Sequence, residues 1–138
     1  MVTSELAKSG VYPIELAAPD IRPYRAGNCG IEYVTSFDSG KAGPHLMLAA
    51  LTHGNELCGA IALDWLLRQG ARPRAGRLTL AFMNVAAYAR FERENPGASR
   101  CVDEDFNRVW SAEVLEGARG AAPRCRARLT APPRSTPG

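Results

Sequence analysis

LMLAALTHGNE, residues Leu46–Glu56, places an apolar run directly before a polar turn. A short apolar run of this kind is typical of a buried strand, and the apolar spacing after the turn is typical of a helix. His53 is therefore expected at the carboxyl end of a strand and Glu56 in the first turn of a helix. Ligand sites form at this position in open α/β sheets. An imidazole and a carboxylate three residues apart can bind one cation, which is half or more of a zinc site.

Three strands are expected around this turn. Residues 45–51 are nearly all apolar, which predicts a central strand covered on both faces. Residues 30–38 alternate well enough for an earlier strand, and residues 77–84 for a later one, with Leu78, Leu80 and Phe82 on one face.

The segment after the turn predicts an amphipathic helix over residues 57–69, with Gly70 as its C-terminal cap. Its apolar stripe is predicted to be core and consists of Leu57, Ile61, Trp65 and Leu66. Cys58 is expected to be a small buried hydrophobic residue. Strand, helix and strand in this order predict a right-handed βαβ unit and an α/β fold with a parallel sheet.

The last 22 residues differ in composition from the rest of the chain. Residues 117–138 contain five Arg, no acid and 17 residues drawn from Ala, Arg, Pro and Gly. Such a segment cannot bury enough apolar surface to offset its ordering entropy, so a disordered tail is expected. An alternative is the out-of-frame translation of a GC-rich gene. The expected organisation is a domain over residues 1–116, which ends in a short helix over residues 111–116, followed by this tail.

Charge and composition exclude several functions. The net charge of +3 becomes −2 when the five tail arginines are removed, so the body has no basic field for nucleic acid. No apolar run approaches the roughly 18 residues of a membrane span, and no signal peptide is apparent. The four cysteines lack metal-binding spacing, which favours reduced thiols and a cytoplasmic location.

A second polar cluster lies about fifty residues after the turn and consists of Arg100 and the run Asp105-Phe106-Asn107-Arg108. Together with THGNE and the strand between them, it resembles the succinylglutamate desuccinylase/aspartoacylase family, part of the wider zinc carboxypeptidase group. The likeness covers residues 31–110. It implies the N-terminal half of a three-layer zinc-carboxypeptidase-like domain, whose sheet is mixed but largely parallel, truncated before its second half.

The resemblance also implies a role for each residue. His53 and Glu56 would be two of three protein ligands of one Zn²⁺, which leaves a position open for water. Arg100 would stabilise the oxyanion of the scissile carbonyl. Asn107 and Arg108 would bind a substrate carboxylate, and Asp105 would orient a ligand or an arginine. A plainer alternative is that Arg100 and Arg108 only neutralise neighbouring acids at the surface.

The family's remaining site residues have no counterpart in this chain. The second histidine ligand is missing, because His45 lies eight residues, or about 26 Å of extended strand, before His53. Only Glu113 and Glu116 follow residue 110, and neither suits the general base. We therefore expect weak zinc binding, negligible turnover and, since half a sheet leaves an edge uncovered, association of the chain.

Three functions stay open at this point. The first is a zinc-dependent deacylase of an N-acylated amino acid or similar small carboxylate, here truncated or frameshifted. The second is a metallocarboxypeptidase that removes a C-terminal residue. The third is a small binding fragment or pseudoenzyme without catalysis.

Overall fold

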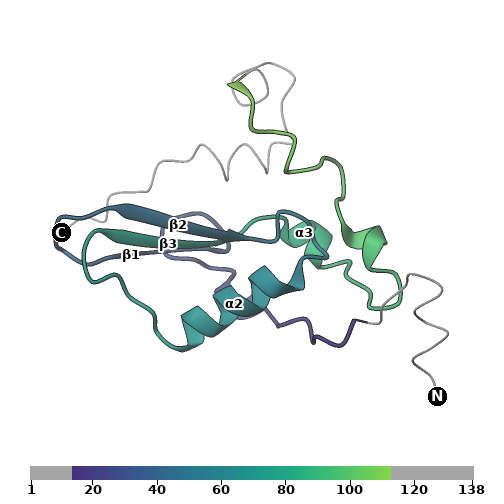
Figure 1. Ribbon diagram of the computed structural model, residues 1–138, viewed down its shortest axis with the longest axis horizontal. Coiled ribbons are helices and arrows are strands. Elements are labelled where there is room, and N and C mark those ends of the chain that lie inside the picture. The colour runs from purple at the N-terminus through teal and green to yellow at the C-terminus, as the bar shows by residue number, and fades with distance from the viewer. Residues whose placement is uncertain (1–13, 113–138) are drawn as a thin grey trace, which may run out of the picture.

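The computed structural model describes residues 14–112. Three strands form one sheet: β1 (Val34–Asp38), β2 (His45–Ala50) and β3 (Arg77–Phe82). The order is β1-β3-β2, with β3 parallel to β2 and antiparallel to β1. Helix α2 (Leu57–Arg68) connects β2 to β3 and packs against both strands (Figure 1). The predicted α/β class, the mixed sheet and the parallel strand-helix-strand unit are confirmed. The tail over residues 117–138, and residues 113–116 of the expected helix, lie outside the described part.

The remaining elements are short. They are the 3₁₀ helix η1 (Arg22–Tyr24), the helix α3 (Val85–Tyr88) and the 3₁₀ helix η2 (Pro96–Ser99). In Figure 1, α3 lies beyond the ends of β2 and β3, on the side to which both parallel strands point. No helix within residues 14–112 is long and apolar enough to cross a membrane.

Among residues 14–112, strand β2 lies at the edge of the sheet, so the prediction that it is central and covered on both faces is wrong. Leu46, Met47 and Leu48 are 59%, 51% and 44% exposed. Strand β3 occupies the centre instead, and its last four residues are buried. An apolar run shows which environment a strand suits, whereas the order of strands depends on long-range pairing that the run does not encode.

Two strand ends fall inside the predicted limits because of backbone conformation. Tyr33 has φ +61° and Leu51 has φ +62°, and neither value is compatible with an extended strand. As a result β1 begins at Val34 rather than within residues 30–33, and β2 ends at Ala50.

Helix α2 buries Leu57, Ala60, Leu63 and Asp64 rather than the whole predicted stripe. Trp65 is 60% exposed, and Cys58 is exposed too, so both predictions are wrong. Each helical residue advances by about 100°, which turns Trp65 about 80° away from Leu57 and Ala60 about 60° in the opposite direction. The helix ends one residue before the predicted limit, with Gln69 rather than Gly70 as its C-cap; Gly70, at φ +66°, follows the cap and donates to the Leu67 carbonyl, so the glycine does end the helix.

The core divides between the two faces of β3. Leu80 and Phe82 pack with α2 and with Leu78 on one face, as the alternation predicted. Ala81 and Met83 lie in a smaller cluster on the other face, which Phe106 also contacts. Phe106 thereby attaches the chain around residues 105–108 to the carboxyl end of the sheet.

Candidate functional site

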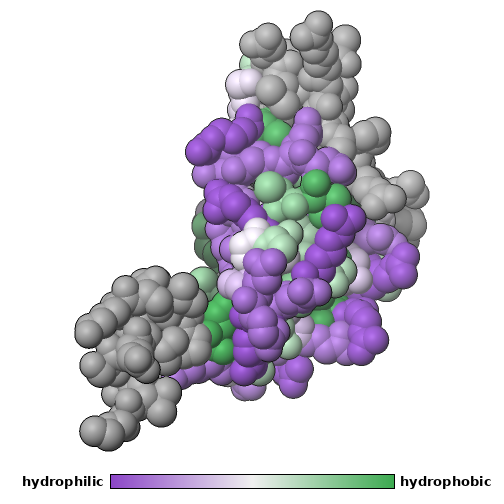
Figure 2. Space-filling model, turned by 90° about the vertical axis from the view of Figure 1, so that its right-hand side faces the viewer, coloured by the Kyte–Doolittle hydropathy of each residue, from purple (hydrophilic) through white to green (hydrophobic). Residues whose placement is uncertain are grey.

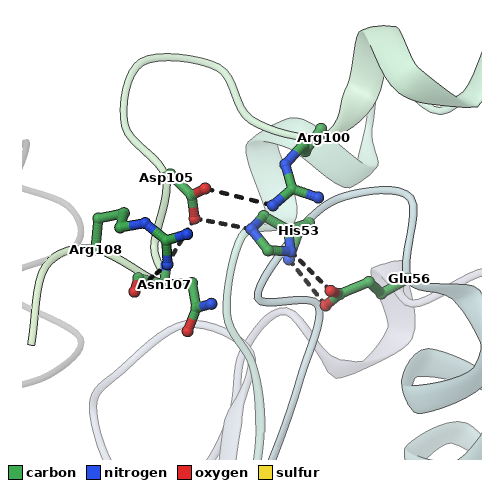
Figure 3. Close-up of polar contacts among 6 residues, drawn as sticks. All are labelled: His53, Glu56, Arg100, Asp105, Asn107 and Arg108. Atoms are coloured by element: carbon green, nitrogen blue, oxygen red, sulfur yellow. Dashed lines mark hydrogen bonds and ion pairs between the residues drawn. The ribbon is translucent and has the colours of Figure 1, made fainter.

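His53 lies three residues beyond the end of β2 and is 4% exposed. Its ring Nδ1 lies 2.7 Å from Glu56 Oε1, and its backbone N–H donates to Glu56 Oε2 at 3.1 Å (Figure 3). Glu56 is the N-cap residue of α2 rather than part of its first turn. The two residues predicted to share a metal ion therefore point at each other across the turn.

Asp105 contacts the other side of the same imidazole. Its Oδ1 lies 2.8 Å from His53 Nε2 and also accepts from the Asn107 backbone N–H at 2.9 Å. Its Oδ2 accepts from Arg100 Nη2 at 3.4 Å. Figure 3 shows His53 between the two carboxylates, with Arg100 beside it. Asp105 thus contacts both an expected metal ligand and an arginine, the two kinds of partner predicted for it.

The turn is also fixed through its backbone. The Gly54 N–H donates to the Arg100 carbonyl at 3.0 Å. A Cβ at Gly54 would collide with backbone atoms of Ser99, Ala87 and Tyr88. Residues 52–56 therefore lie against α3 and η2 with no room for a side chain at position 54.

The three charged groups perturb one another. Hydrogen bonding to Glu56, assisted by Asp105 and opposed by burial, raises the pKa of His53. Burial alone would raise the pKa of Glu56, but the hydrogen bonds from the His53 ring and backbone outweigh it, and this pKa is lowered. The Asn107 N–H and the His53 ring lower the pKa of Asp105 to about 2. The geometry therefore favours an imidazolium between two carboxylates.

Arg100, Asn107 and Arg108 are exposed. The Arg108 guanidinium donates to the neighbouring Asn107 carbonyl at 3.2 Å, and no carboxylate within residues 14–112 pairs with it. Arg100 therefore fits the plainer alternative of a surface ion pair in part, but Arg108 does not. Figure 2, which faces this end of the molecule, shows hydrophilic side chains around smaller hydrophobic patches.

The pair His53 and Glu56 has the right donor atoms for zinc, but at hydrogen-bonding distance. A tetrahedral zinc holds an imidazole nitrogen and a carboxylate oxygen about 3.4 Å apart, so the observed 2.7 Å must widen. No group of three or more His, Cys, Asp and Glu side chains suited to a metal occurs within the described residues. His45 belongs to a different contact, since its Nε2 lies 2.8 Å from Thr79 Oγ1. The described residues thus fit two ligands of a zinc site.

Sequence reasoning missed two residues that support the turn. One is Gly54, whose position inside HGNE is the available signal. The other is Asn84, whose Oδ1 caps α3 by accepting from the Ala87 N–H at 3.2 Å. An asparagine directly before the apolar VAAY segment is a recognisable N-cap pattern.

Comparison with known proteins identifies the family of the chain. The family model of the succinylglutamate desuccinylase/aspartoacylase catalytic domain matches residues 42–131, well over half of the chain. This match includes His53, Glu56 and the segment from Arg100 to Arg108. No curated protein and no solved structure matches the chain. The chain therefore belongs to the succinylglutamate desuccinylase/aspartoacylase catalytic-domain family.

Proposed function

We propose that this chain carries part of the site of a zinc-dependent hydrolase that cleaves the amide bond of an N-acylated amino acid or a similar small carboxylate. Membership of a generally zinc-dependent, hydrolytic family supports this proposal. The observation that carries it is the placement of His53 between Glu56 and Asp105, with Arg100 on the same aspartate.

His53 Nδ1 and Glu56 Oε1 would bind the zinc ion. With Asp105 accepting from the Nε2 N–H, the ring would be held in orientation, and zinc would replace the proton that the metal-free imidazolium carries on Nδ1. When bound, zinc supplies a hydroxide at neutral pH and polarises the substrate carbonyl. The zinc-carboxypeptidase-like three-layer fold is part of the same proposal, because it supplies the further strands on which the third ligand would lie.

The exposed cations would bind the substrate. Arg108 has a guanidinium free of carboxylates of the described chain, so its two-pronged donor face is available to a substrate carboxylate, with Asn107 beside it. Arg100 lies next to His53 and would stabilise the negative charge that develops on the scissile carbonyl. The long contact of 3.4 Å to Asp105 leaves Arg100 able to move toward that oxygen.

For the chain by itself we propose weak zinc binding and negligible turnover. Two ligands from one turn leave most of the coordination to water, and the residues described hold no third one. This observation also favours a second candidate, a binding fragment without catalysis. In that case Arg108 would still bind a small carboxylate, but zinc would not change the affinity.

Isothermal titration with zinc tests the metal site. We expect weak binding that His53→Ala and Glu56→Gln abolish and that the matched variant His45→Ala retains. Equal binding by wild type and His53→Ala would contradict the proposal. Tight binding that His53→Ala abolishes would instead reveal a third ligand, contrary to the weak binding we propose.

Titration with N-acetylaspartate or N-succinylglutamate tests the substrate site. Arg108→Ala should weaken binding, whereas Arg74→Ala, in the exposed loop at the opposite end of the sheet, should not. Zinc that strengthens binding favours the hydrolase, and zinc without effect favours the binding fragment.

A further inference from the structure

Leu51 joins β2 to the turn that carries His53, and its backbone is unusual. It has φ +62°, a left-handed conformation that residues with a Cβ rarely adopt. Its side chain is 1% exposed and lies in the main core cluster. A strained residue persists only where its surroundings determine its conformation, and such residues gather at functional sites.

The surroundings hold Leu51 from two directions. Its carbonyl accepts from the Asn84 N–H at 2.8 Å, directly after the Ala50 carbonyl accepts from the Met83 N–H at 2.8 Å. Its side chain meanwhile packs among the residues under α2. The β2–β3 hydrogen bonding is thus kept up to Leu51, and the chain changes direction there, two residues before His53.

The two peptide groups that follow this change of direction depend on it. The His53 N–H donates to Glu56 Oε2, and the Gly54 N–H donates to the Arg100 carbonyl. An extended residue at position 51 would continue the line of β2 and carry both donors away from these acceptors. The left-handed conformation is therefore what brings the turn between Glu56 and the 100–108 segment.

We propose that Leu51 is a positioning residue for His53, acting through its left-handed backbone, while its buried side chain contributes to the global stability of the core. The functional meaning rests on the proposed function, in which His53 binds zinc, but the positioning itself concerns the metal-free chain. The effect of a substitution at position 51 on the placement of His53 should therefore depend on whether the new residue tolerates a positive φ, and not only on its hydrophobicity.

Leu51→Ile tests this, because isoleucine has the same atoms as leucine but is branched at Cβ and disfavours this φ more strongly. The matched control is Leu80→Ile in β3, which is also 1% exposed and in the same cluster but has no positive φ. Leu51→Met, unbranched at Cβ, is the conservative variant. Amide hydrogen exchange of His53 and Gly54 is measured by NMR without metal, alongside global unfolding by urea.

We expect Leu51→Ile to lower the protection of these two amides about tenfold relative to the global stability of the same variant. Leu80→Ile and Leu51→Met should leave the ratio of the protection of these amides to the global stability of the variant unchanged. Protection that falls only in step with global unfolding would overturn the proposal. If Leu51→Ile does not fold, Leu51→Gly decides: glycine accepts the φ, so it should retain the ratio despite lower stability, and a loss there would also overturn it.

Zinc titration of the same variants separates this proposal from the function. Wild type that binds no zinc, with Leu51→Ile still losing protection of the two amides, would overturn the metal site and leave the positioning role intact. Normal zinc binding by wild type, with unchanged protection of the two amides in Leu51→Ile, would overturn the positioning role and leave the metal site intact.

Discussion

Gly54 has room for a hydrogen atom and nothing larger, because backbone atoms of Ser99, Ala87 and Tyr88 surround the place of a Cβ. We expect Gly54→Ala to cost about 2–4 kcal/mol of stability, since rigid backbone rather than a flexible side chain must move. The same substitution should abolish zinc binding by displacing His53.

Gly97→Ala is the matched control, because its Cβ would meet nothing within 4 Å and its φ is not positive. Urea unfolding of both variants and zinc titration provide the measurements. Equal stability of the two variants would show that the turn can move away from α3 and η2.

At the same scale, the sequence predicted the principal contacts of the site. His53, Glu56, Asp105 and Arg100 do gather; their spacing along the chain predicted only that His53 and Glu56 meet, and the resemblance to the family implied that Arg100 and Asp105 belong to the same site. The sequence did not predict Leu51 as a supporting residue. A leucine at the end of an apolar run gives no sign of a left-handed backbone, which arises from packing around it.

Among the elements, α3 connects the site to the N-terminal segment through Tyr88. The Tyr88 hydroxyl donates to the Pro19 carbonyl at 2.6 Å, and burial raises the pKa of Tyr88 to about 12 from 10.0. A raised pKa means that the neutral phenol contributes stability that is complete below pH 10 and is lost as the pH rises from 10 to 12.

We therefore expect wild type to lose about 1.4 kcal/mol between neutral pH and pH 11 through this group. Tyr88→Phe should cost about 1 kcal/mol at neutral pH, for the lost hydrogen bond, and should show a shallower alkaline loss. Urea unfolding at several pH values measures both. Identical alkaline slopes in the two proteins would contradict this account.

The elements also show where sequence periodicity is informative. All three strands and α2 were predicted, since alternation and helical spacing are local properties. The prediction for Trp65 was wrong because the predicted stripe followed the large apolar residues. Around the helix axis, Ala60 and Trp65 lie on either side of Leu57, and the helix buries the small Ala60 and leaves the Trp65 indole exposed. The short elements α3 and η2 carry little periodicity; the Asn84 cap was an available signal for α3 that sequence reasoning missed, and the N-cap of η2 makes no side-chain hydrogen bond.

At the scale of the whole molecule, the free edge of β2 predicts self-association. Leu46, Met47 and Leu48 are exposed on a strand that pairs with β3 alone within the described chain, and none of them is charged. Natural edge strands avoid pairing by placing charges there. Leu48→Lys should therefore shift the chain toward monomer.

Sedimentation velocity over a range of concentrations measures this shift. Trp65→Lys is the matched control, because it removes an apolar side chain that is even more exposed, at 60% against 44% for Leu48, from the outer face of α2 rather than from the edge. A cooperatively melting, monodisperse wild-type monomer would contradict the prediction, as would an equal effect of both substitutions.

The bond from the Gly54 N–H to the Arg100 carbonyl has a consequence for engineering. This bond and the contact between the Asp105 carboxylate and the His53 ring join the turn to the 100–108 segment, and a backbone bond from the Arg108 N–H to the Asp105 carbonyl holds that segment in shape. The side chains at positions 107 and 108 take no part in these contacts. A combinatorial library at these two positions would therefore change ligand preference while the contacts of His53 with Glu56 and Asp105 stay in place.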